Sequence, residues 1–133
     1  MNRRAFLIAS LLAATSPLML LGPAHAASDL TVIYVGGGDC PPCMQWKKTQ
    51  KARWLGSPEV SKVTWVEVES PKLKEAYQER YWPAGLRPVL AQLPRRSGTP
   101  RFLIVKDGKV VSNEFGGDRW LATLADLKKR LGE

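Results

Sequence analysis

Hydrophobic positions along the chain fall into four short runs that predict β-strands. The runs are rich in β-branched and aromatic residues and cover 30–35, 63–69, 102–106 and 110–115. In the second run Thr64, Val66 and Val68 share one face, as in a half-buried strand. Asp107-Gly108 separates the last two runs and predicts a tight hairpin, so these two strands should pair antiparallel.

Helical patterns lie between and after these runs. A helix is expected from Pro41 to Leu55, because prolines are tolerated in a first turn and strong helix formers follow. The polar stretch 72–80 predicts a second helix, and prolines and glycines over 81–100 predict a loop with one helical turn near Val89. Asp118 is the expected N-cap of a last helix, whose leucines recur at three- and four-residue steps: Leu121, Leu124, Leu127 and Leu131.

The order of these elements predicts an α/β fold with a four-stranded mixed sheet flanked by helices on both faces. A helix joins the first strand to the second, and a crossover of this kind makes the two strands parallel. We expect one small domain over residues 27–133, because the first 26 residues are predicted to be removed as an export signal and the rest is too short for two domains.

The first 26 residues have the pattern of a cleavable export signal. A basic start is followed by an apolar run over 5–21 and by Ala24-His25-Ala26, a typical cleavage site. Arg3-Arg4 also fits a twin-arginine signal, although a general secretory signal fits nearly as well. An uncleaved membrane anchor is the alternative, but the apolar run is short for a span. We therefore expect a periplasmic or otherwise exported protein.

Composition narrows the chemistry. The 133 residues carry a net charge of +8, two cysteines and one histidine. A basic surface of this size is explained by solubility, and we expect a monomer with no nucleic-acid partner. The histidine is His25, inside the predicted signal, so the mature chain has none. This excludes Cys-His nucleophilic catalysis and every histidine-containing zinc site in the mature protein.

The two cysteines form the motif Cys40-Pro41-Pro42-Cys43. Such a pair can be a redox dithiol, half of a metal site or a structural disulfide bond. Tetrahedral metal sites usually need four ligands, which this chain lacks, and a disulfide across so short a loop stabilises little. A redox-active centre that needs no metal and no cofactor is therefore favoured.

The position of the motif at a strand-to-helix junction adds a physical reason. If Cys40 is the helix N-cap, Pro41 and Pro42 have no N–H to donate, and the amide of Cys43 is the nearest donor for the Cys40 sulfur. The helix dipole favours a thiolate there, whereas the charge of Asp39 opposes it. Asp39 cannot itself cap, because its usual partners are the two prolines, so a solvated loop acid is expected rather than a proton carrier.

Together with three further motifs, this one resembles the thioredoxin-like family. The others are Thr99-Pro100 before the strand 101–105, the turn 106–109 and Gly116-Gly117 before the last helix. The resemblance implies a thioredoxin-like fold in which Cys40 attacks a partner disulfide and Cys43 resolves the mixed disulfide. It also implies that Pro100 is cis and lies against the cysteines, leaving the backbone of Thr99 open to an extended substrate segment.

Two departures from the family limit what can be carried over. Asp39 stands where many thioredoxins have tryptophan, and Tyr34 stands where they have a buried acid. The proton on Cys43 must then be handled by water, Asp39 or another group. The segment before Thr99 is long, and its arginines, with the one after Pro100, are expected to be solvated loop charge rather than a site for acidic partners or anionic thiols: Arg87, Arg95, Arg96 and Arg101.

The leading hypothesis is a thiol:disulfide oxidoreductase that acts on protein cysteines outside the cytoplasm. Two lost N–H donors and the adjacent Asp39 reduce thiolate stabilisation and favour a reductase, which needs a membrane electron donor. A second hypothesis is Cu(I) binding through Cys40 and Cys43, with Met44 as a third ligand. A third is a thioredoxin-fold adaptor that binds partners without turnover.

Overall fold

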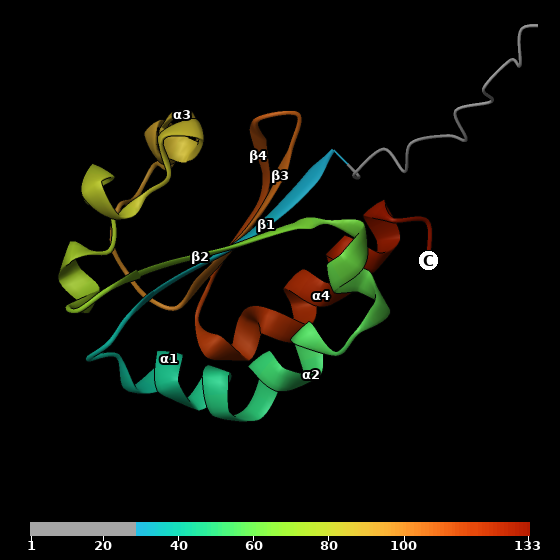
Figure 1. Cartoon of the computed structure of the whole chain (residues 1–133), viewed down its shortest axis with the longest axis horizontal. Coiled ribbons are helices and arrows are strands. Elements are labelled where there is room, and N and C mark those ends of the chain that lie inside the picture. The colour runs from blue at the N-terminus through green and yellow to red at the C-terminus, as the bar shows by residue number, and fades with distance from the viewer. Residues whose placement is uncertain (1–28) are drawn as a thin grey trace, which may run out of the picture.

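The four predicted strands form one mixed sheet in the computed structural model, which describes residues 29–133. They are β1 (Leu30–Gly37), β2 (Thr64–Ser70), β3 (Arg101–Lys106) and β4 (Lys109–Phe115), in the spatial order β2-β1-β3-β4 (Figure 1). β1 pairs parallel with β2 and antiparallel with β3, and β3 pairs antiparallel with β4. The mixed sheet flanked by helices that the sequence predicts is therefore confirmed.

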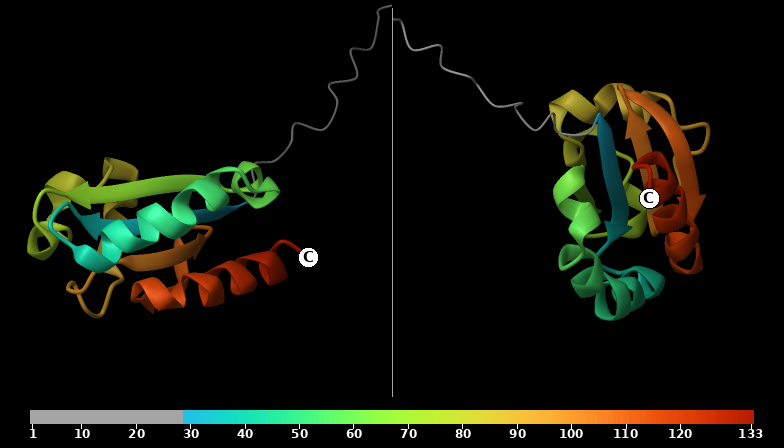
Figure 2. Two further views of the ribbon diagram at one scale, coloured as in Figure 1. Left: turned by 90° about the horizontal axis from the view of Figure 1, so that it is seen from below. Right: turned by 90° about the vertical axis from the view of Figure 1, so that its right-hand side faces the viewer.

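Helices cover both faces of the sheet (Figure 2). On one face, α1 (Pro41–Trp46), a π-helical turn (Lys47–Lys51) and α2 (Ala52–Leu55) follow one another without a break and lie near α4 (Trp120–Arg130). On the other face lie α3 (Arg87–Ala91) and several 3₁₀ turns. The helix predicted over 41–55 and the helical turn predicted near Val89 are both confirmed.

Strand alternation divides the buried residues into two cores. Residues at even positions of β1 and β3 face α1, α2 and α4, and we call this group the cysteine-side core: Leu30, Val32, Tyr34, Cys40, Cys43, Trp46, Trp54, Phe102, Ile104, Trp120 and Leu127. Residues at odd positions face α3, and we call this group the α3-side core: Ile33, Val35, Val68, Ala76, Tyr77, Trp82, Val89, Leu90, Leu93, Leu103 and Val105.

The structure corrects the helix predicted over 72–80. This stretch holds only two 3₁₀ turns, Leu73–Glu75 and Glu79–Tyr81. Its polar residues face solvent while Ala76 and Tyr77 are buried on the sheet, and the indole N–H of Trp82 donates to the Ala76 carbonyl at 2.9 Å. Burying a few side chains against the sheet therefore outweighs a helical propensity that has no apolar stripe to support it.

The start of the last helix is also corrected. Asp118 lies in a 3₁₀ turn, Gly117–Arg119, and α4 begins at Trp120 with Arg119 as its cap residue. Leu121 is 62% exposed, so the buried face of α4 is formed by Trp120, Thr123 and Leu127. The leucine pattern is therefore wrong at its first position, where Trp120 is buried in place of Leu121.

The remaining local predictions concern the hairpin and the N-terminus. Asp107 and Gly108 have φ of 49° and 78°, the positive values that a two-residue turn between antiparallel strands requires. Within residues 29–133 no helix is long and apolar enough to cross a membrane. The export signal predicted over 1–26 lies outside the described residues.

Candidate redox site

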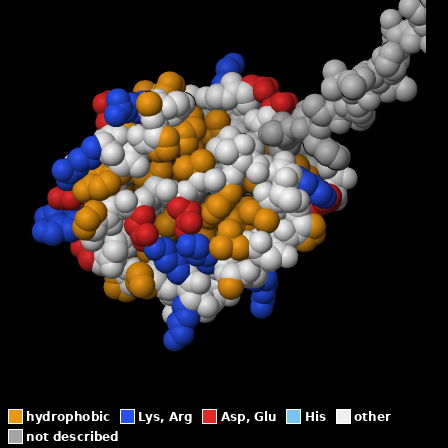
Figure 3. Space-filling model, in the orientation of Figure 1, with side chains coloured by type: hydrophobic (Ala, Val, Ile, Leu, Met, Phe, Trp, Pro, Cys, Tyr) orange, Lys and Arg blue, Asp and Glu red, His pale blue; other side chains and the backbone are white. Residues whose placement is uncertain are grey.

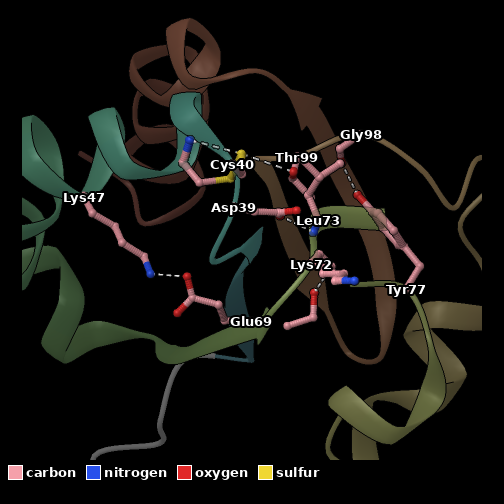
Figure 4. The surroundings of a disulfide bond; sticks show 11 residues. Asp39, Cys40, Lys47, Glu69, Lys72, Leu73, Tyr77, Gly98 and Thr99 are labelled. Atoms are coloured by element: carbon pink, nitrogen blue, oxygen red, sulfur yellow. Dashed lines mark hydrogen bonds and ion pairs between the residues drawn. A yellow bond between two sulfur atoms is a disulfide. The ribbon is translucent and has the colours of Figure 1, made fainter. Parts of the chain in front are cut away.

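The two cysteines lie where β1 ends and α1 begins, and they are joined by a disulfide with a Cα–Cα distance of 5.2 Å (Figure 4). They are the only cysteines in the sequence, so the structure is the fully oxidised form. Cys40 is 1% exposed and Cys43 is completely buried. The disulfide is therefore almost completely covered in this form of the protein.

Cys40 is the N-cap of α1. Its backbone is extended (φ −103°, ψ 104°) and its Sγ accepts a hydrogen bond from the Cys43 amide at 3.2 Å. Pro41 and Pro42 occupy the first two helical positions and are exposed. The predicted donor for the Cys40 sulfur is confirmed, for the predicted reason that neither proline has an N–H.

A distant segment completes the surroundings of the disulfide. The Thr99–Pro100 peptide bond is cis, as predicted, and both residues are buried. The Thr99 hydroxyl donates to Cys40 Sγ at 3.3 Å, across 59 positions of sequence. Thr99 therefore contacts the first cysteine. The role of Thr99 and Pro100 in binding a substrate remains a prediction.

The turn between β4 and α4 lies beside the same group. The Gly116 amide donates to the Pro100 carbonyl at 2.9 Å. A Cβ added at Gly117 would lie 3.5 Å from the Pro42 carbonyl oxygen and 3.9 Å from Pro100 Cγ. Three segments far apart in the sequence thus converge at the disulfide.

Asp39 has a structural partner. Its carboxylate accepts a hydrogen bond from the Leu73 amide at 2.6 Å, which ties the loop before Cys40 to the 3₁₀ turn after β2 (Figure 4). The side chain is exposed, as expected for a loop acid. The contact that holds it is between loops, and sequence spacing gave no sign of it.

Tyr34 lies on β1 and belongs to the same core as both cysteines. It is fully buried, and its ring stacks on Trp46 with centroids 4.8 Å apart. Its hydroxyl has no hydrogen-bond partner among residues 29–133. Burial, with the nearby charges of Glu69 and Glu67, raises the pKa of Tyr34 well above its ordinary value, so the phenol stays neutral.

Ion pairs link the π-helical turn after α1 to the edge strand β2. Lys47 pairs with Glu69, and Lys51 pairs with Glu67 at 2.6 Å. Figure 3 shows acidic and basic side chains adjoining one another on this face. A shallow depression of about 460 Å³ lies here between Gly38, Lys47 and Pro71, and Met44, which is 52% exposed, lines it.

Metal binding gains no support from these surroundings. Both candidate thiol ligands are taken up by the disulfide in this form of the protein. The described residues contain no group of three His, Cys, Asp or Glu side chains placed to hold a metal ion. Met44, the third ligand considered for Cu(I), is mostly exposed on α1.

The arginines around the site divide into two kinds. Arg87, Arg95 and Arg96 are exposed, as expected for loop charge. Arg101 is only 7% exposed, so its assignment to a solvated loop is wrong. It is the first residue of β3, and its alternation with Leu103 and Val105 was the signal that could have placed it inside.

The structure of this protein is similar to solved structures of other proteins. No model of a protein family matches the sequence, and no curated protein matches it. The structure is similar to Fasciola hepatica thioredoxin, with 19% identity and a TM-score of 0.48 over 75% of this chain and 83% of that one.

Two further thioredoxins are similar at the same level. The oxidised thioredoxin from Plasmodium falciparum has 17% identity and a TM-score of 0.47, over 80% of this chain and 85% of that one. Chlamydomonas reinhardtii thioredoxin f2 has 18% identity and a TM-score of 0.47, over 74% of this chain and 79% of that one. Likeness at this level assigns no activity, so the site's own geometry must support any function.

Proposed function

We propose that this protein is a thiol:disulfide oxidoreductase that acts on protein cysteines outside the cytoplasm, as a reductase. The observation that carries the proposal is the arrangement at Cys40. The disulfide between Cys40 and Cys43 lies at a helix N-terminus. Its first sulfur accepts hydrogen bonds from the Cys43 amide at 3.2 Å and the Thr99 hydroxyl at 3.3 Å. The same two donors can stabilise a thiolate when the disulfide is open.

The proposed reaction starts from the reduced protein. The Cys40 thiolate attacks one sulfur of the partner's disulfide, forms a mixed disulfide and releases one partner thiolate. The Cys43 thiolate then attacks Cys40 Sγ, which releases the second partner thiol and forms the disulfide seen in this structure. The partner gains two electrons and two protons, and the protein loses them.

Thr99 and Pro100 form the docking edge of the proposed mechanism. Thr99 has its side chain on Cys40, and the chain around it precedes β3 rather than pairing within the sheet. An extended segment of the partner can add to such an edge through main-chain hydrogen bonds, with its disulfide beside Cys40. Pro100 cannot donate an N–H there, so Thr99 supplies the backbone pairing.

The direction of exchange follows from how few groups favour the thiolate. A strong oxidant is one whose reduced form is stabilised, and here both prolines withhold a donor. Among residues 29–133, one amide and one hydroxyl donate to Cys40 Sγ, and Asp39, next to it, is negative. The reduced form is therefore less favoured, and the dithiol gives up its electrons more readily.

The export signal predicted over 1–26 supports the proposed location. An exported reductase works against an oxidising compartment, so it must receive electrons from a donor in the membrane. Cys40 and Cys43 are the only cysteines in the sequence, so their disulfide must take up the electrons. The donor therefore has to present a dithiol to Cys40.

Turnover of a protein disulfide tests the activity. Wild type should catalyse insulin reduction by dithiothreitol, whereas Cys40→Ser should lose activity at least about 1,000-fold, since the nucleophile is absent. Cys43→Ser should form a mixed disulfide with insulin that is not resolved. A Cys40→Ser variant as active as wild type would contradict the proposal, and Met44→Leu serves as a control that should stay active.

The reduction potential tests the direction. A value near about −270 mV, the region of thioredoxin, supports a reductase. A value near about −120 mV, the region of the strong periplasmic oxidants, would contradict it. Trapping in cells with Cys43→Ala should then collect mixed disulfides with exported proteins. If all trapped partners are cytoplasmic proteins, the proposed location is contradicted.

A further inference from the structure

Arg101 is a buried arginine whose partners are all neutral. Its Nε donates to the Tyr77 hydroxyl, its Nη1 to Asn113 Oδ1 and its Nη2 to the Ser97 carbonyl, each at 2.7 Å. The guanidinium also lies 5.4 Å from the centroid of the exposed Phe115 ring. Within residues 29–133, none of the ion pairs includes Arg101.

A buried charge without a counterion is costly, so simple core packing does not explain this residue. Burial of a charged group costs several kcal/mol unless partners compensate, and an aliphatic side chain would fill the same space without that cost. Arginine differs from an aliphatic residue in having several donors fixed in one plane. Its function at this position must therefore come from where those donors point.

Tyr77 forms the second half of the arrangement. Its hydroxyl accepts from Arg101 Nε and donates to the Gly98 carbonyl at 2.5 Å. Burial raises the pKa of Tyr77 above its ordinary value, with Arg101 opposing the effect, so the hydroxyl keeps its proton at neutral pH. Figure 4 shows the Tyr77 side chain reaching Gly98 on the side away from Cys40.

Arg101 and Tyr77 thus hold two consecutive carbonyls, those of Ser97 and Gly98. We call these two side chains the clamp. Thr99, the next residue, donates its hydroxyl to Cys40 Sγ at 3.3 Å on the opposite side. The segment that leads into the cis proline is therefore fixed from both faces of the sheet.

The backbone at Gly98 depends on the same packing. Its φ is +90°, a region that disfavours any residue with a Cβ. A Cβ there would also lie 2.8 Å from the Phe115 ring. The carbonyl of Gly98 can then turn towards Tyr77 because no side chain stands in the way.

We propose that Arg101 and Tyr77 are positioning residues for substrate recognition, which hold segment 97–99 in the register that docks a partner's extended segment beside Cys40. This inference rests on the function proposed above and names the residues that prepare its docking edge. The clamp has no hydrogen bond to either cysteine sulfur. It acts through the backbone of the docking edge rather than on the thiol chemistry.

The consequence is a split between substrates. A protein disulfide binds along the edge and requires segment 97–99 in place, whereas a small disulfide needs only the Cys40 sulfur. Loss of the clamp should raise KM for insulin about 5- to 20-fold and leave kcat within about twofold. The rate with a small aromatic disulfide, dithiobis(nitrobenzoate), should change less than about twofold, and the reduction potential should stay unchanged.

The principal variant is Tyr77→Phe, which removes the hydroxyl and keeps the ring. Its matched control is Tyr81→Phe, because the Tyr81 hydroxyl also makes one side-chain hydrogen bond, to Glu75 at 3.3 Å, away from segment 97–99. Arg101→Lys keeps the charge but loses the planar fork, and should show the same KM defect as Tyr77→Phe. Hydrogen exchange at the Gly116 amide, which donates to the Pro100 carbonyl at 2.9 Å, should quicken at least about tenfold in both clamp variants.

The outcomes separate the two proposals. If wild type turns over insulin and Tyr77→Phe has the KM and amide exchange of Tyr81→Phe, the clamp is contradicted and the activity stands. If Tyr77→Phe loses reactivity with insulin and with the small disulfide equally, the clamp acts on the disulfide and the inference is wrong. If wild type reduces neither substrate, the proposed function fails, and the role of the clamp in docking fails with it.

Discussion

The two sides of the sheet differ in how the polar atoms of their buried aromatic rings are hydrogen-bonded. On the cysteine side, four buried donors have no hydrogen-bond partner within the described part of the chain: the hydroxyl of Tyr34 and the indole N–H groups of Trp46, Trp54 and Trp65. On the α3 side, the Trp82 indole, the Tyr77 hydroxyl and the Arg101 guanidinium are all hydrogen-bonded. One side is held by ring packing, and the other also specifies backbone positions through hydrogen bonds.

This difference separates the residues that support the disulfide from those that hold the segment before Pro100. Trp46 is central to the cysteine side, with ring centroids of Tyr34, Phe102 and Trp120 at 4.8, 5.2 and 5.3 Å. Such a cluster gives the disulfide a rigid, apolar base. The α3 side instead holds the carbonyls of Ser97 and Gly98, in the segment proposed above as the docking edge. Loss of a tyrosine hydroxyl should therefore have different effects on the two sides.

The largest effect should come from the ring cluster. Trp46→Ala should lower the free energy of unfolding by about 3–5 kcal/mol, because it removes a buried indole that contacts four other rings. Urea unfolding measures this value. Leu121→Ala, at an exposed position of α4, is the control and should stay within about 0.5 kcal/mol of wild type. A loss below 1 kcal/mol for Trp46→Ala would contradict the rigid base.

A smaller effect should follow from filling the space beside Tyr34. In Gly36→Ala the new Cβ would lie 2.0 Å from the Tyr34 hydroxyl and 2.4 Å from its ring carbon, so the ring must shift. We expect a loss of about 1–3 kcal/mol by urea unfolding. Gly85→Ala, where no atom lies within 4 Å of the added Cβ, should change stability little. Equal stability of the two variants would show that the cluster is not tightly packed.

The comparison is sharpest for two identical substitutions on opposite sides. Tyr77→Phe should cost about 1–3 kcal/mol, because it leaves the Gly98 carbonyl and Arg101 Nε without their partner. Tyr34→Phe removes a hydroxyl that has no partner, so stability should stay equal or rise by up to about 1 kcal/mol. If both variants lose the same stability, the contrast between the two sides does not hold.

The smallest effect concerns alkaline pH. The folded-state pKa of Tyr34 is raised above its unfolded value, so its contribution is fully present below about pH 10 and is lost as the unfolded chain ionises above that pH. Unfolding free energy measured between about pH 8 and pH 11 should therefore fall, and the fall should be shallower in Tyr34→Phe. A steeper fall in that variant would contradict the assignment.

The features that could be predicted from the sequence have local causes or are marked by a motif. The capping of Cys40 by the Cys43 amide followed from two residues without an N–H, and the hairpin followed from Asp107-Gly108. The cis bond at Pro100 followed from a motif resemblance. Each depends on a few neighbouring residues or on a short pattern, so the surrounding fold was not needed to predict it.

Sequence reasoning missed the features that depend on distant partners. Arg101 was placed among solvated arginines, because the acceptors that make its burial tolerable come from Tyr77, Ser97 and Asn113 on three different segments. The stretch 72–80 was predicted as a helix because its polar composition carries no record of the sheet face that buries Ala76 and Tyr77.

The sequence by itself determined the reactive pair, its place at a helix start and the donor available to its first sulfur, since these follow from covalent neighbours. Only the tertiary structure decided that Thr99 would donate to that sulfur and that Arg101 and Tyr77 would hold the carbonyls before it. The physical reason is that a hydrogen bond needs a donor and an acceptor at the right distance. Across 59 positions of sequence, only the packing of the sheet sets that distance.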